Sequence, residues 1–106
     1  MSWTLELRQA FAALRAGRPA RVEFTGQPGK VGEIGEEFNQ LAAALVERGA
    51  NGWSREQSHA LRNRLAGLLA MLHLLRLTAP LTPEELDTLG TIVLEAKELD
   101  AQLRAR

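Results

Sequence analysis

Residues 54–77 read SREQSHALRNRLAGLLAMLHLLRL, and the spacing of their leucines indicates the fold class. Its leucines at positions 61, 65, 68, 72 and 75 alternate steps of four and three, the spacing of one face of an amphipathic helix. Leucines at 69, 74 and 77 widen that face, which suits a four-helix bundle better than a two-stranded coiled coil. Ser54 and Gln57 predict a capping box, so we expect a long helix from Ser54 to about Leu77.

A second helix follows after the short link 78–81 and is expected to fold back as an antiparallel hairpin. Thr82, Pro83 and Glu85 predict its start as N-cap, first helical residue and capping-box acid. Its expected apolar stripe is Leu86, Leu89, Ile92, Val93, Ala96, Leu99 and Leu103. Because one pair of helices leaves half of each apolar face bare, we expect two copies of this hairpin to form a dimeric four-helix bundle.

Two more helices are predicted before this hairpin, at about 4–16 and 31–48. Gly17 and Pro19 end the first, and Gly49 is placed to cap the second. Between them, residues 20–30 (ARVEFTGQPGK) favour an extended connector with Val22 and Phe24 as apolar anchors; a β-hairpin is the alternative. The second helix has its own seam, formed by Val31, Ile34, Phe38, Leu41 and Leu45. The predicted fold class is all-α, with two helical units.

Composition excludes several classes of function. The 106 residues contain 13 basic and 13 acidic side chains, so there is no global positive charge to draw nucleic acid or an anionic membrane. Cysteine is absent, which rules out disulfides, thiolate metal sites and cysteine nucleophiles. The longest uncharged apolar stretch, 65–75, is too short to span a bilayer. We therefore expect a cytoplasmic chain that binds no metal, no nucleic acid and does not insert into a membrane.

The charges are distributed unevenly over the hairpin. Residues 54–76 carry four arginines against one glutamate, and residues 83–106 carry six acids against three bases. One interpretation is that the two helices pair with each other. The other is that the basic helix, through Arg55, Arg62 and Arg64, binds an acidic protein partner.

One constellation has the residue types needed for chemistry. His59 lies outside the leucine seam, with Asn63 one turn after it and Glu56 one turn before it. An imidazole in water beside an amide and a carboxylate suits a histidine that accepts a phosphoryl group from another protein. A merely solvated histidine is the alternative. His73, within LLAMLHLLRL, is expected at the edge of the core without a functional role.

Residues 58–65, SHALRNRL, resemble the phospho-acceptor H-box of sensor histidine kinases, which reads Ser-His-Glu-Leu-Arg-Thr/Asn-Pro-Leu. Six of the eight positions match. The resemblance implies that residues 50–106 form a dimerisation and histidine-phosphotransfer domain, a hairpin that dimerises as a four-helix bundle. It also implies that His59 is the phospho-acceptor and that Asn63 positions water during dephosphorylation.

Two positions depart from that box. Ala60 stands where the family has an acidic base, and Arg64 stands where proline is common. Phosphorylation would then need another base, and Glu56 is the nearest candidate by helical spacing. Loss of the proline removes the usual kink from the helix.

Residues 1–49 resemble the HAMP linker that precedes this domain in such kinases, two parallel helices joined by an extended connector. RVEF resembles its connector and GEIGEEFNQLAAAL the opening of its second helix, although Ile34 and Phe38 are closer together than in the family. The resemblance implies a parallel HAMP-like dimeric bundle followed by the antiparallel one.

None of the ATP-binding motifs of the kinases is present, and GQPG and GKVG are turns rather than phosphate cradles. The chain is therefore expected to bind no cofactor and to need a separate or missing kinase domain as its phosphate source. The resemblance implies three partners: a second copy, a response-regulator receiver domain that carries Mg²⁺, and an ATP-binding domain acting in trans. Two alternatives stay open: a non-catalytic dimeric interaction module of the same ancestry, and an unrelated helical bundle.

Overall fold

The computed structural model describes residues 2–48 and 54–104. Four α-helices and one 3-10 turn account for most of them: α1 (Trp3–Arg15), η1 (Phe24–Gly26), α2 (Lys30–Arg48), α3 (Arg55–Thr78) and α4 (Pro83–Arg104). No strand occurs in the two described ranges, so the all-α prediction is confirmed. The expected cap at Gly49 lies outside the described residues. Among the described helices, none has both the length and the hydropathy required to cross a bilayer.

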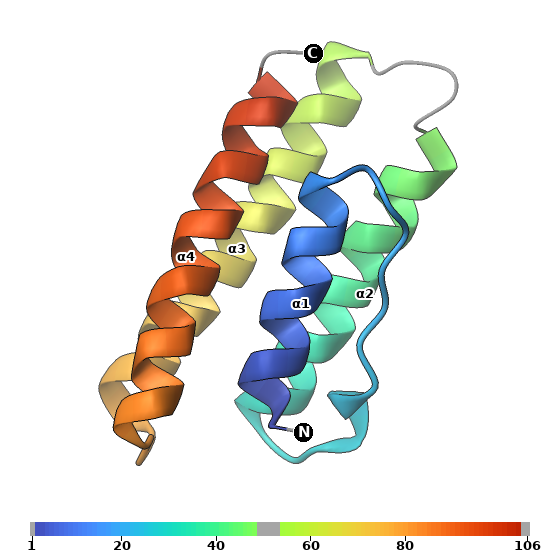
Figure 1. The fold of residues 1–106 in the computed structure, drawn as a ribbon. Helices are drawn as coiled ribbons and strands as arrows, with labels where there is room; N and C mark the ends of the chain where they lie inside the picture. The colour runs from blue at the N-terminus through green and yellow to red at the C-terminus, as the bar shows by residue number, and fades with distance from the viewer. Residues whose placement is uncertain (1, 49–53, 105–106) are drawn as a thin grey trace.

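The four helices form a single bundle (Figure 1). α1 and α2 run in the same direction, because the connector returns along the bundle between them. α3 then runs back along α2, and α4 runs back along α3 and beside α1. We call α1 and α2 the first half of the chain, and α3 and α4 the second half. The parallel helix pair expected in the first half and the antiparallel hairpin expected in the second half are both present.

The helix ends follow the local sequence signals. Gly17, at φ 78°, closes α1 in a Schellman motif, in which the Arg18 N–H donates to the Ala13 carbonyl at 2.9 Å. α4 begins with a reciprocal capping box: the Glu85 N–H donates to the Thr82 hydroxyl at 3.1 Å, and the Thr82 N–H donates to the Glu85 carboxylate at 2.9 Å. The predicted ends agree with the observed ones to within one residue.

One hydrophobic core joins the two halves. All five seam leucines of α3 are buried, as predicted, and so are six of the seven stripe residues predicted for α4. The exception is Leu86, which is 37% exposed, because it lies at the flank of α4 rather than on its core face. His73 is also exposed rather than at the core edge, since its position on α3 points away from the seam.

The halves cover each other's apolar faces within one chain. α1 packs along α4 and α2 packs along α3, so the bare faces that suggested a dimer are already covered in the monomer. Edge-to-face contact between Phe11 and Phe38, with ring centroids 4.9 Å apart, closes the bundle between α1 and α2. A dimeric bundle therefore remains a proposal. Within one chain, α1 and α2 already cover the apolar faces of α3 and α4 that predicted it.

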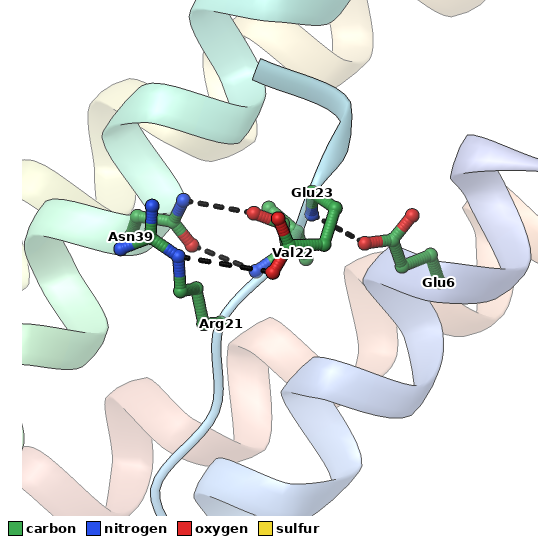
Figure 2. A network of polar contacts seen from close by, with 5 residues as sticks. All are labelled: Glu6, Arg21, Val22, Glu23 and Asn39. Atoms are coloured by element: carbon green, nitrogen blue, oxygen red, sulfur yellow. Dashed lines mark hydrogen bonds and ion pairs between the residues drawn. The ribbon is translucent and has the colours of Figure 1, made fainter.

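The connector is held to both helices of the first half (Figure 2). Val22 and Phe24 are buried, which confirms the two predicted anchors. Asn39 of α2 binds Val22 twice: its amide oxygen accepts from the Val22 N–H at 2.8 Å, and its amide nitrogen donates to the Val22 carbonyl at 3.0 Å. On the other side, the Glu6 carboxylate of α1 accepts from the Glu23 N–H. The two Asn39 bonds satisfy the polar backbone groups of Val22, which is fully buried and would otherwise leave them unpaired.

Two glycines allow the connector to lie close to the start of α2. A Cβ placed on Gly32 would meet the Gln27 carbonyl oxygen at 2.0 Å, and one on Gly35 would meet the Phe24 ring at 3.0 Å. The glycines that interrupt the opening of α2 in the sequence are thus required by close packing.

We expect Gly32→Ala to lower the free energy of unfolding by about 1–3 kcal/mol, because the obstructing atom is backbone. Gly67→Ala is the matched control. A Cβ there meets nothing within 4 Å, so alanine should stabilise α3 by about 0.5–1 kcal/mol. Urea unfolding followed by circular dichroism measures both changes, and equal effects in the two variants would contradict this packing.

We expect Asn39→Ala to lower the free energy of unfolding by about 2 kcal/mol, because it leaves both polar backbone groups of Val22 unpaired. Val22 is fully buried, so water cannot replace the lost amide without disturbing the core. Gln9→Ala removes a similar amide from an exposed position and should change stability by less than about 0.5 kcal/mol. Chemical denaturation of the pair checks this, and an Asn39→Ala variant as stable as wild type would refute the clamp.

Candidate functional site

The N-terminal end of α3 fixes the position of His59. The Gln57 N–H donates to the Ser54 hydroxyl at 3.1 Å, and the Ser54 N–H donates to the Gln57 side chain at 3.0 Å. This capping box starts the helix at a defined residue and so sets which side chains point outward in the next two turns. Glu56, His59 and Asn63 are all exposed, on the side of α3 away from the leucine seam. These three residues are called the outer stripe below.

A hollow of about 230 Å³ lies between α3 and α4, beside two residues of the outer stripe. His59 and Asn63 line it from α3, and Lys97 and Asp100 line it from α4. Leucine and alanine side chains of α3 complete its wall. The hollow thus brings together an imidazole, an amide, an ammonium and a carboxylate from two helices.

Asp100 is fixed by two arginines. Its carboxylate accepts from Arg62 Nε of α3 at 3.0 Å and from Arg104 of α4 at 2.9 Å. The side chain is 21% exposed, which limits how far water weakens these contacts. Arg62 is therefore held against α4, about one turn after His59 and directly before Asn63 in α3.

Two opposing effects act on the pKa of Asp100. Partial burial alone would raise the pKa, but the hydrogen bonds and positive charges of Arg62 and Arg104 outweigh it and lower the pKa below its ordinary value. The carboxylate therefore stays ionised at neutral pH and serves to hold the arginines rather than to accept a proton.

Several groups that line the hollow could contribute to phosphoryl transfer to a histidine. An imidazole nitrogen in open water can attack phosphorus, and a nearby ammonium such as Lys97 can attract the anionic phosphoryl oxygens. An amide such as Asn63 can hold a water molecule by hydrogen bonds in either direction. Within the described residues, no side chain hydrogen-bonds to His59, so its ring is free to engage an incoming group.

The predicted partner-binding arginines differ in their surroundings. Arg64 donates to Glu37 of α2 at 3.2 Å and also bonds Gln40, while Arg62 is paired with Asp100. Arg55 is exposed and makes no ion pair with any residue in the described ranges. The basic residues of α3 thus pair with α4 at Arg62 and with α2 at Arg64.

Lys97 and Asp100 are site residues that sequence reasoning did not single out. Asp100 lies within the α4 stripe, between Leu99 and Leu103. The sequence does contain a signal for the contact between Arg62 and Asp100. Arg62 precedes the 78–82 link by nearly as many residues as Asp100 follows it, so an antiparallel hairpin places the two residues opposite each other. A polar residue in a seam, opposite an arginine, predicts an ion pair across the hairpin.

A lowered pKa for Asp100 predicts a specific pH dependence. The stability that Asp100 contributes is present above its unfolded pKa of about 3.9, and it is lost as the pH falls through its lower folded value. Asp100→Asn should therefore lose stability at pH 7 and show a smaller further loss between pH 5 and pH 2 than wild type. Asp87→Asn, an exposed aspartate of the same helix, should behave as wild type. Denaturation midpoints across this range check the difference, and parallel curves for all three proteins would contradict the ion-pair role.

Comparison with known protein families, with curated proteins and with solved structures found no match to this chain. A functional assignment therefore depends on the H-box-like segment 58–65 and on the geometry around His59.

Proposed function

We propose that this chain is a phosphotransfer module of two-component signal transduction, with His59 as the phospho-acceptor. The observation that carries the proposal is the exposed pair His59 and Asn63, one helical turn apart, beside a hollow that also contains Lys97. The partner would be a response-regulator receiver domain, whose bound Mg²⁺ and aspartate supply the other half of the reaction. Phosphate would come from that regulator or from a kinase domain supplied in trans.

The transfer is a substitution at phosphorus. The lone pair of an imidazole nitrogen of His59 attacks, a nitrogen–phosphorus bond forms, and the bond from phosphorus to the donor oxygen breaks with its electron pair on that oxygen. The ring then loses the proton of its other nitrogen. In the forward relay, a carboxylate oxygen of the receiver aspartate attacks phosphorus, and the imidazole leaves and takes up a proton.

Two carboxylates lie near His59, and they suit different roles. Glu56 is exposed and one turn away, so it is the proposed proton acceptor where Ala60 lacks an acid. Asp100 is bound to Arg62 and Arg104 and stays ionised, so its proposed role is to hold Arg62 in place. Lys97 is the proposed contact for the phosphoryl oxygens.

A second function is favoured by one observation. Ala60 offers no carboxylate, and no described side chain hydrogen-bonds to His59, so the ring has no fixed proton acceptor. A protein of the same ancestry could then bind a signalling partner through α3 without exchanging phosphate. The two functions share a surface and differ only in whether His59 becomes labelled.

We expect wild-type protein to acquire acid-labile, base-stable label when mixed with receiver domains charged with radioactive acetyl phosphate, or with a histidine kinase and labelled ATP. His59→Ala should acquire none, because its imidazole is the attacking group. His73→Ala is the matched control, an exposed histidine of the same helix outside the hollow, and should label as wild type. Asn63→Ala should still label but should slow loss of phosphate from the receiver by about tenfold or more.

Label on His59→Ala equal to wild type would remove His59 from the role of acceptor. If wild type acquires no label from any donor and still binds a receiver domain, with His59→Ala binding equally well, the interaction module is the function instead. Calorimetric titration of the two proteins with the same receiver domain measures that binding.

A further inference from the structure

Net charge alternates around the bundle. α1 has one acid and two bases, α2 has four acids and two bases, α3 has one acid and four bases, and α4 has six acids and two bases. The helices therefore carry net charges of +1, −2, +3 and −4, and every helix has neighbours of opposite sign. Opposite charge on adjacent helices favours this order over one that places α1 next to α3.

Ion pairs join oppositely charged helices at both boundaries between the halves. Arg15 of α1 contacts Glu95 at 2.6 Å and also Glu98, both on α4. Arg64 of α3 contacts Glu37 of α2 at 3.2 Å. The Arg15 guanidinium lies between two carboxylates, and its hydrogen bond and proximity to Glu95 raise the pKa of this group.

A second copy of the hairpin would fit the same face. In a ring of two hairpins, α4 would lie next to the α3 of the other copy, a positive helix, and α3 next to the other α4, a negative helix. α1 and α2 occupy these two places and carry the same signs. α1 runs opposite to the direction that a second α3 would take, so the match is one of apolar faces and charge rather than of chain direction.

We propose that α1 and α2 are an in-chain substitute for a second α3–α4 hairpin. The chain is then a monomer in this form, and a second copy pairs with the α3–α4 face only once α1 and α2 have moved off it. The leucines of α3 cannot be buried by both occupants at once, so the two states exclude each other. The outer stripe lies on the opposite side of α3 and stays accessible in both.

The covalent link between the two halves favours the closed form, in which α1 and α2 cover the apolar face of α3 and α4. A short link gives the first half an effective concentration of roughly 1 mM at the α3–α4 face, about a hundredfold above a second copy at 10 µM. An open form without an occupant would expose the whole apolar face of the second half to water, which is strongly unfavourable. Weakening the contacts between the halves should therefore produce a dimer rather than an open monomer.

The test reverses two charges on the first half and leaves the α3–α4 face unchanged. Arg15→Glu with Glu37→Arg places like charges opposite Glu95 and Arg64. Arg8→Glu with Glu36→Arg is the matched control: it makes the same charge changes at residues that form no ion pair in the described part of the chain. Sedimentation equilibrium at about 10 µM gives the mass, and circular dichroism gives the helix content.

We expect wild type and control to be monomers, and the Arg15→Glu, Glu37→Arg variant to be a helical dimer. Adding Glu95→Arg, Glu98→Arg and Arg64→Glu to that variant should restore the monomer, because it rebuilds the contacts with reversed sign. A wild-type dimer, or a variant that is monomeric, whether folded or unfolded, would overturn the proposal. The measured mass does not depend on His59, so this proposal can fail while the phosphotransfer proposal holds, and the reverse.

Discussion

The burial of the α3 and α4 leucines against the first half of the same chain is the interaction on which the structure depends. A two-helix hairpin with so wide an apolar face needs a second layer, and α1 and α2 provide it. Arg15 with Glu95 and Arg64 with Glu37 then fix which helix lies against which. Apolar burial supplies the driving force, while the ion pairs, being partly exposed, mainly select the arrangement.

The packing of the first half against the second determines the path of the connector, residues 16–29. For α1 and α2 to run in the same direction, the chain must return along the length of the bundle, and its backbone must be satisfied on the way. Asn39 does so at Val22, Glu6 does so at Glu23, and the missing side chain of Gly32 makes room for the last turn. Polar and small residues thus hold the connector along the two helices that it joins.

The sequence was sufficient for the helices and most of the core, because seams and caps are local signals. Ser54, Thr82 and Gly17 each act within one turn of chain. It failed where the decisive contact was between distant segments. A bare apolar face predicts that a second layer covers it, but nothing local indicates that residues 3–48 fold back over residues 55–104 to provide one. Lys97 and Asp100 were missed for the same reason, because only the hairpin register brings them to His59.

The position of His59 follows from the same constraint that closes the bundle. The seam leucines Leu61 and Leu65 face inward, and His59 lies on the opposite side of α3. Burial of the leucines therefore keeps the His59 ring in water. A residue on this outer stripe can change without cost to packing. The phosphotransfer proposed for His59 would therefore not depend on whether the α3–α4 face is covered by α1 and α2 or by the proposed second copy, because neither occupant reaches the outer stripe.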